Sequence, residues 1–464
     1  MKTVFWFRRD FRIEDNPVLA APCEICLPIF IFDKNILGDF KANDPRITFI
    51  FNKVKKLKND LMKNGMNLAI FYGCPDEIFR YLKKEGYNKV IFSQDYTRRS
   101  IERDRQISEI IDTTIVRDNF LFHPSEIKKN DGTPYKMFSP FYRTAKNKMD
   151  ESQLIKFPFN YSKIAGFNYD NIYIIENNEI IKKPISIENI GFVENCVDNF
   201  AADKSPEYLC ERLKNLINNY ESNREYPALD ETSHLGVHLR FGTISIRELV
   251  RFVKSLKEDG FQTETFMKQL LWREFFNSVL YNFPHSEFEN FKDVEIPWEN
   301  DLKFFEHWKN GTTGVPIVDA AMRQLNKTGY MHNRLRMVVA SFLTKDLHTD
   351  WRWGEEYFKQ KLFDYEASSN IGSWQWAAST GCDAQPYFRV FNPYRQAEKF
   401  DKDAEFIKKW VPELQSFKAG DIHSEDKLFE IDVKNYTRPV CRHETESRKS
   451  IELFRIHFKT DRKA

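Results

Sequence analysis

The 464-residue sequence lacks the features by which membrane and secreted proteins are recognised. No run of apolar residues approaches the length that spans a bilayer, and the chain opens in the strand-like segment TVFWF instead of a charged and then apolar signal peptide. The net charge is only +2 against 70 Lys and Arg residues, so binding to nucleic acid would require a local basic face. We expect a cytoplasmic protein with no membrane partner.

The sequence also lacks the cysteine spacing that a disulfide framework or a metal site would show. The seven cysteines are odd in number and scattered, which favours a reducing compartment. Cys23 and Cys26 form a lone C-x-x-C, a spacing that a redox pair or half of a zinc site would have. No second ligand pair follows at zinc spacing, and the second cysteine lies at the start of an apolar run. We therefore expect both cysteines to pack in the core, and no metal site.

The dinucleotide-binding fingerprint G-x-G-x-x-G is absent after the first predicted strand, which argues against a Rossmann dehydrogenase. Residues 1–125 instead alternate short apolar runs with amphipathic stretches, a pattern typical of a parallel sheet wrapped by helices. They are predicted to form a Rossmann-like α/β domain. The predicted strands are 4–7, 25–33, 67–72 and 89–94, and the predicted helices are 46–64, 76–86 and 97–111.

The rest of the chain has a different pattern. Residues 126–200 are polar, Asn-rich and interrupted by proline, and we interpret them as an interdomain linker. Residues 201–464 have few strand signals and are predicted to form an all-α domain. Its predicted helices are 205–220, 244–257, 262–281, 315–325, 332–346 and 352–362.

Several polar residues stand where a ligand could use them. Thr232 and Ser233 lie near a predicted helix start, where hydroxyls and backbone N–H groups can hold a phosphate, although these residue types are also ordinary helix caps. Asn333, Arg336 and Met337 share one face of a largely apolar helix. An amide and a guanidinium placed there need polar partners, and a bound polar ligand would be one.

Tryptophans form the second group of candidates. Trp272 lies mid-helix in LLWREFF, while Trp298, Trp351 and Trp374 stand in separate segments of the helical domain. Trp376 projects from a face next to that of Trp374. Buried tryptophans are often structural, but a platform that stacks on a nucleobase would also use them.

Three long motifs carry a specific resemblance. WFRRDFRIEDNPVL near the N-terminus, TGVPIVDAAMRQL at 313–325 and the stretch from WQWAAS to PYFRVFNP resemble the photolyase/cryptochrome family, and class I cyclobutane pyrimidine dimer photolyases in particular. The resemblance covers essentially the whole chain. It implies an α/β domain that often holds an antenna chromophore, followed by a helical domain that buries a U-shaped FAD.

The resemblance also implies roles for the residues that match the family motifs. Asn370 would face flavin N5, where Asn is the photolyase-like residue, and Arg336 would favour the anionic reduced flavin. Gly236 stands where many relatives have Ser, so the hydrogen bond that a hydroxyl there would give to a phosphate is not expected in this chain. The implied FAD-binding residues are Tyr220, Thr232, Ser233, His234, Leu235, Gly236, Asp364, Tyr365, Glu366 and Asn370.

Two more sets follow from the same resemblance. Trp374, Trp351 and Trp298 would pass electrons from the surface to the flavin. Trp272 and Trp376 would flank a dimer flipped out of the duplex. The implied lesion and DNA contacts are Arg224, Gln269, Trp272, Arg273, Asn333, Arg334, Met337, Trp376 and Gln396.

Gln269 departs from the cyclobutane-dimer pattern, which has Glu at this position, and Gln is common in six-four photolyases and animal cryptochromes. Asn333 and Met337 favour cyclobutane dimers, because six-four enzymes carry histidines in that helix. The expected activity is blue-light repair of UV-damaged DNA by a monomeric FAD enzyme, a light-dependent carbon–carbon lyase. A six-four photolyase, a signalling cryptochrome and a plain flavin oxidoreductase are the alternatives.

The stretch QDYTRRSIERD at 94–104 lies where relatives contact a folate or deazaflavin antenna. Its residues do not choose between the two chromophores, and an empty site is a third alternative.

Overall fold

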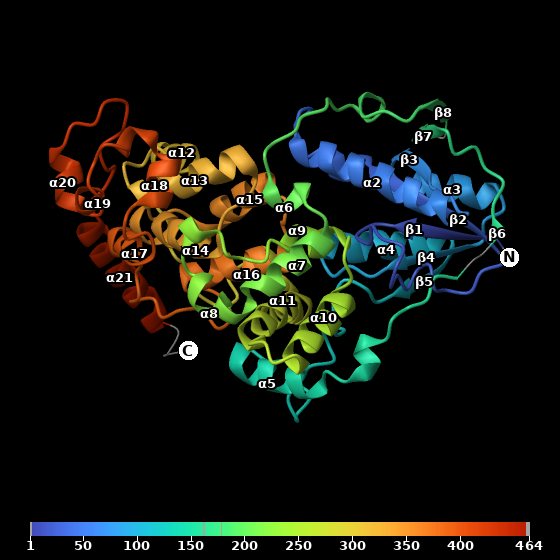
Figure 1. The fold of residues 1–464 in the computed structure, drawn as a ribbon, viewed down its shortest axis with the longest axis horizontal. Helices are drawn as coiled ribbons and strands as arrows, with labels where there is room; N and C mark the ends of the chain where they lie inside the picture. Colours follow the sequence, from blue (N-terminus) through green and yellow to red (C-terminus); the bar gives the residue numbers. More distant parts are fainter. Residues whose placement is uncertain (1, 161–162, 178, 461–464) are drawn as a thin grey trace. The chain divides into compact units, whose positions relative to one another are not determined.

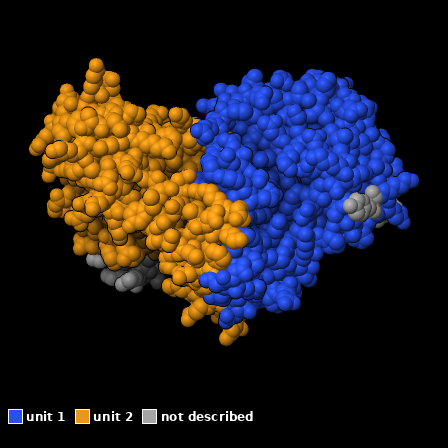
Figure 2. Space-filling model, viewed as in Figure 1, with its two compact units in different colours: residues 1–126, 146–210, 234–260 blue, residues 127–145, 211–233, 261–464 orange. Residues whose placement is uncertain are grey.

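The computed structural model describes residues 2–160, 163–177 and 179–460. These residues divide into two compact units (Figure 2). Unit 1 comprises residues 1–126, 146–210 and 234–260, and unit 2 comprises 127–145, 211–233 and 261–464. Two of the unit 1 segments, 146–210 and 234–260, lie beyond the predicted boundary at residue 125. No helix within the described ranges is long and apolar enough to cross a membrane.

Unit 1 is built on an eight-stranded sheet (Figure 1). Its order is β5-β4-β1-β2-β3-β7-β8, with β6 paired to the first residues of β2. All neighbours are parallel except β7 and β8. The strands are β1 (Lys2–Phe7), β2 (Ile25–Asp33), β3 (Ala69–Gly73), β4 (Lys89–Ser93), β5 (Asp112–Val116), β6 (Lys163–Ile164), β7 (Asn171–Glu176) and β8 (Glu179–Pro184).

Helices cover both faces of this sheet. On one face, Phe5 and Phe7 pack in a cluster with the apolar stripe of α2 (Pro45–Lys63). On the other face, Val4 and Trp6 pack with residues of α3 (Pro75–Lys84) and α4 (Arg98–Ile110). Burial on both faces explains why the central strands are continuous apolar runs and not alternating ones.

A buried ionic cluster holds α10 (Ile246–Glu258) within unit 1. Arg247 of this helix donates to Asp118 at 2.8 Å and to Asp15 at 3.2 Å. Arg12, which follows β1, contacts the same Asp118 carboxylate at 2.5 Å. Because a buried carboxylate is costly unless it is paired, each of these charges depends on the others. Unit 1 also contains α1 (Lys34–Leu37), α6 (Phe200–Asp203) and α9 (Gly236–Phe241), while the boundary after Cys210 falls within α7 (Pro206–Leu216).

Unit 2 is helical, and its core is centred on α13 (Pro316–Thr328), which is buried along most of its length. A π-helical turn, Phe342–Asp346, continues α14 (Asn333–Ser341). Its helices are α8 (Tyr220–Asn223), α11 (Glu264–Asn282), α12 (Leu302–Asn310), α13 (Pro316–Thr328), α14 (Asn333–Ser341), α15 (Trp351–Lys361), α16 (Ala367–Ala378), α17 (Pro393–Phe400), α18 (Glu405–Trp410), α19 (Ala419–Ile422), α20 (Glu425–Glu430) and α21 (His443–Thr460); α5 spans Phe138–Lys148.

The predicted fold class, a parallel α/β part and a helical part, is confirmed. The segment 126–200 was interpreted as a linker, but in the structure its residues 163–184 contribute β6, β7 and β8 to the sheet. β8 is exposed throughout, and β7 is a short apolar run between polar residues. Neither has enough local pattern to be recognised, because pairing with β3 is what orders β7.

Candidate active site

Unit 2 contains a pocket of about 460 Å³, a size that suits an organic cofactor or part of one. Helices α11, α14, α15 and α16 supply most of its wall. The lining residues are Arg224, Glu225, Gln269, Trp272, Phe276, Asn333, Arg334, Arg336, Met337, Ala340, Phe358, Leu362, Asp364, Tyr365, Glu366, Ser369, Asn370, Ser373, Trp374 and Trp376.

One face of α14 forms a polar side of the pocket. Asn333, Arg336, Met337 and Ala340 line it at spacings of three and four residues, as the helical period requires. His332 caps the start of this helix, and its ring nitrogen accepts from the N–H of Arg334 at 3.2 Å. The cap places the first turn, and with it the Asn333 amide, at the pocket.

Arg336 has its own protein partners. Its Nη2 donates to both carboxylate oxygens of Asp364, at 3.0 and 2.9 Å, and its Nε donates to the Met331 carbonyl at 2.8 Å. These bonds compensate the desolvation that the sequence predicted for a guanidinium on an apolar helix. They also fix the positive charge at the pocket wall.

Asn370 of α16 is tied to α15. Its Nδ2 donates to Oε1 of Glu355 at 3.0 Å and to the Glu355 backbone carbonyl at 3.2 Å. The phenol of Tyr365 donates to the same Oε1 at 3.0 Å. Burial raises the pKa of the Glu355 carboxyl above its usual value, although both donors act in the opposite direction. Sequence reasoning missed Glu355, because no local pattern brings it to Asn370.

An aromatic stack supports Trp272. The ring of Phe138 lies parallel to the indole, with 3.7 Å between centroids and 10° between planes. The N–H of Phe138 donates to Oδ2 of Asp383 at 3.0 Å, a residue just after α16. Sequence reasoning missed Phe138 as well, since it lies in the segment interpreted as a linker. Only the tertiary contact identifies it.

Arginines stand beside the aromatic wall. The Arg334 guanidinium pairs with Glu225 and lies over the ring of Phe400, 4.3 Å from its centroid. Burial lowers the pKa of Arg334 from its usual value, and the nearby Arg224 adds to this shift. Arg224 is itself 3.5 Å from Glu225. The two arginines carry two positive charges and Glu225 carries one negative charge, so the three side chains together have a net charge of +1.

The three predicted relay tryptophans differ in burial. Trp374, which lines the pocket, is 2% exposed and Trp351 is 1% exposed, while Trp298 is partly exposed and packs against the same core cluster. Gly354 of α15 permits this packing, because a Cβ there would lie 2.1 Å from the Trp374 ring. Trp351 donates its indole N–H to Asn290 at 2.8 Å.

Other predicted site residues do not line the pocket. Arg273 points to Glu366, with 3.1 Å between Nη2 and Oε2, and Tyr220 is buried against Phe266. Gln396 lies on α17, and Thr232 bonds to the phenol of Tyr330 at 3.1 Å. His234, Leu235 and Gly236 belong to unit 1, whereas Thr232 and Ser233 belong to unit 2, so their shared role at one cofactor stays a prediction.

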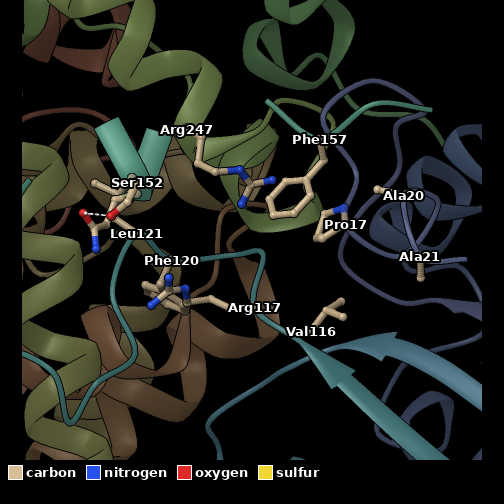
Figure 3. A pocket seen from close by; sticks show the side chains of 11 residues that line it. Pro17, Ala20, Ala21, Val116, Arg117, Phe120, Leu121, Ser152, Phe157 and Arg247 are labelled. Atoms are coloured by element: carbon tan, nitrogen blue, oxygen red, sulfur yellow. Dashed lines mark hydrogen bonds between the residues drawn. The ribbon is translucent and has the colours of Figure 1, made fainter. Parts of the chain in front are cut away.

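A second pocket, of about 380 Å³, lies within unit 1 (Figure 3). Its walls include Phe120, Phe157 and Arg247, and no residue of 94–104 lines it. The 94–104 stretch instead follows β4, where Asp95 pairs with Arg9 at 3.2 Å. Arg9 itself follows β1. The carboxyl ends of β1 and β4 lie side by side at the point where the strand order reverses. Ligands of such sheets usually bind at this point.

Comparisons with known proteins agree with this architecture. Residues 3–158 match the family model of DNA photolyase, and residues 266–455 match that of the FAD binding domain of DNA photolyase. The chain is 34% identical to a deoxyribodipyrimidine photo-lyase of Halobacterium salinarum, over 97% of this chain and 98% of the relative. The identity is 33% to that of Alkalihalophilus pseudofirmus, over 97% of each.

Solved structures show the same likeness. A class III photolyase from Agrobacterium tumefaciens superposes with a TM-score of 0.84 at 29% identity, covering 98% of this chain and 97% of that one. An archaeal photolyase from Sulfolobus tokodaii, solved with two FAD molecules, gives 0.80 at 32% identity over 98% and 100%. The fold is thus that of a light-dependent flavoprotein with an FAD-binding helical domain. The chain belongs to the DNA photolyase family, as the sequence motifs predicted, and its relatives here are deoxyribodipyrimidine photo-lyases.

The pocket in unit 2 fits the flavin part of FAD. Its walls combine apolar side chains with a fixed cation at Arg336 and an amide at Asn370. Within the described residues, the buried indole N–H of Trp374 has no hydrogen-bond partner. A buried donor without a partner is costly. This nitrogen is shielded from the pocket as well as from solvent, so the fit to the flavin rests on the lining residues.

Proposed function

We propose that the protein repairs cyclobutane pyrimidine dimers in DNA, using light-driven electron transfer from reduced FAD. One observation carries the proposal: a single pocket brings together the residues expected to tune a flavin, Arg336 and Asn370, and those expected to hold a lesion, Trp272, Asn333 and Trp376. Electron transfer needs donor and acceptor in close proximity, and a shared pocket meets that need.

Bound FAD would supply the excited electron donor, which is chemistry that no side chain offers. Arg336 would hold the ring by its fixed charge, and Asn370 would contact it through its amide. Trp374, Trp351 and Trp298 would deliver an electron inward from the surface. Trp272 and Trp376 would stack on the flipped dimer, while Asn333 and Arg334 would donate hydrogen bonds to it. Exclusion of water by the apolar walls would strengthen the electrostatic interactions in the pocket.

The choice of lesion rests on α14. No histidine lines the pocket of the described structure, and the positions facing it carry Asn333 and Met337, whose amide nitrogen and sulfur lie 3.9 Å apart. Histidines there would have favoured a six-four product. Gln269 also lines the pocket, with its Nε2 bonded to the Thr265 carbonyl at 3.4 Å. Its amide can both donate and accept, so it is compatible with hydrogen bonding to a thymine carbonyl.

Repair is tested with reduced protein and oligonucleotides that carry one thymine dimer or one six-four product. We expect blue light to restore thymine absorbance with the dimer only, and the dark control to stay unchanged. Restoration of the six-four substrate alone would reassign the lesion. Failure with both, while bound FAD still responds to light, would favour a signalling cryptochrome.

We further propose a monomeric, cytoplasmic enzyme whose sequence-independent affinity for DNA comes from Arg and Lys contacts to phosphates. That affinity should fall with salt. An antenna chromophore in the α/β part would extend the light absorbed. The ends of β1 and β4 beside residues 94–104 and the pocket of Figure 3 are the two places in unit 1 where it would be sought.

A further inference from the structure

We propose that Asp383 is a positioning residue, which fixes the Trp272 indole relative to Trp376 by holding residues 136–138, the strap, against the end of α16. The inference rests on the proposed function, in which the two indoles flank a flipped dimer. Asp383 and the strap both belong to unit 2, and neither lines its pocket. The consequence concerns how well the protein distinguishes damaged from undamaged DNA.

The strap supports Trp272 through Phe138. The Phe138 ring lies parallel to the indole, with 3.7 Å between centroids and 10° between planes. Phe138 is buried and does not line the pocket, whereas Trp272 does. Because the energy of an aromatic stack depends on the offset and angle of the two rings, a shift of Phe138 would change where the indole stands in the pocket.

Two hydrogen bonds fasten the strap to the chain that follows α16. The Phe138 N–H donates to Oδ2 of Asp383 at 3.0 Å, and the Cys382 thiol donates to the Lys136 carbonyl at 3.0 Å. Burial raises the pKa of the Cys382 thiol to about 12, so the thiol keeps its proton and remains a donor. A thiol is a weak donor, whereas a carboxylate makes a strong, charge-assisted bond. Asp383 therefore provides most of the attachment.

Asp383 is fixed in turn to the helix that carries Trp376. After α16 the chain folds back on the last turn, where the N–H groups of Thr380 and Gly381 both donate to the Gln375 carbonyl, at 3.1 and 3.0 Å. A Cβ at Gly381 would lie 2.8 Å from the carbonyl carbon of Gln375, so this turn is tightly packed. One residue separates Gly381 from Asp383. The carboxylate thus has a set position relative to the end of α16.

The strap adds to what helix packing already provides. A Cβ at Gly372 of α16 would lie 2.2 Å from the Phe276 ring of α11, so the two backbones are in close contact. This contact leaves the side chain of Trp272 free to rotate, and the stack on Phe138 removes that freedom. An indole fixed in advance loses less entropy when a flipped dimer stacks on it. Undamaged DNA, which binds through its phosphates, does not benefit.

The backbone at Asp383 determines which variants give a clean test. Its φ of 50° lies in the left-handed region, which Gly and Asn adopt more readily than other residues. Asp383→Gly removes the carboxylate without backbone strain. Asp383→Asn keeps an oxygen that can accept from the Phe138 N–H. Asn435→Gly is the matched control, because Asn435 is exposed and has a φ of 64°.

The readout is the Kd for an undamaged oligonucleotide divided by the Kd for one with a single thymine dimer, titrated in the dark with FAD-loaded protein. We expect Asp383→Gly to lower this ratio about tenfold, as for the loss of one charge-assisted hydrogen bond. The Kd for undamaged DNA and the rate of flavin photoreduction should not change, although a general structural defect would alter both. Asp383→Asn should stay within about threefold of wild type, and Asn435→Gly should match it. Hydrogen exchange at the Phe138 amide should accelerate in Asp383→Gly alone.

A double-mutant cycle tests whether Asp383 acts through the stacked ring. Adding Asp383→Gly to Phe138→Ala should not lower the ratio further. A further loss would overturn the proposal, as would a wild-type ratio in Asp383→Gly or an equal loss in Asp383→Asn. A wild-type protein with no preference for the dimer would refute the proposed function together with this inference. A wild-type preference that Asp383→Gly retains would refute the inference alone.

Discussion

Gly354 offers a sharp test of how the pocket is built. Replacing it with alanine would place a Cβ 2.1 Å from one carbon of the Trp374 ring, 2.5 Å from another and 2.7 Å from Leu343. Real Cβ atoms essentially never approach closer than 3.0 Å, so the indole or the helix must move by about 0.9 Å. Neither neighbour can yield easily, because Trp374 is 2% exposed and Leu343 is fully buried.

Two effects of opposite sign set the magnitude. Overpacking a core costs about 1–3 kcal/mol. Alanine in place of glycine within a helix returns about 1 kcal/mol. The difference is about 0–2 kcal/mol, by which we expect Gly354→Ala to lower the free energy of unfolding. We also expect it to slow light-driven flavin reduction, because the displaced indole is the one that lines the pocket.

Urea unfolding measures the first effect, and the rate of flavin reduction under steady blue light measures the second. Gly420→Ala is the matched control, since a Cβ at Gly420 would meet nothing within 4 Å. A Gly354→Ala protein as stable as wild type, with unchanged photoreduction, would refute this account of the packing.

Three further predictions follow from other parts of unit 2. Burial holds the pKa of Lys345 well below its usual value, so the unfolded chain binds a proton that the folded chain lacks. The free energy of unfolding should therefore rise with pH up to about 10. Lys345→Met should add about 1–3 kcal/mol to it at pH 7, measured by urea unfolding, and should flatten its rise with pH. Trp374→Phe should block photoactivation but spare repair by chemically reduced enzyme, and equal loss of both would contradict its role as a relay. Phe138→Ala removes the ring stacked on Trp272 and should weaken binding of a dimer-containing oligonucleotide about tenfold, with Phe138→Tyr restoring it; unchanged affinity in a titration would show that the stack is only structural.

Local pattern determined much of this protein. The continuous apolar runs at 25–33 and 89–94 are strands in the structure at 25–33 and 89–93, because a strand buried on both faces has no polar side to interrupt it. The face shared by Asn333, Arg336 and Met337 lines one pocket, because the period of a helix fixes which residues point together.

Tertiary structure decided what no local pattern contains. β7 is a strand because β3 offers it a partner. Phe138 stacks on Trp272 of the pocket wall because the chain brings it back to that residue, 134 positions further on. Glu355 reaches Asn370 only where α15 packs on α16. These contacts join residues from separate elements, and their energy depends on the folded neighbour and not on the residue type. The sequence by itself determined the elements with a strong local pattern and the residues that face inward in them. Packing determined the weaker strands β6 to β8 and which of the residues meet.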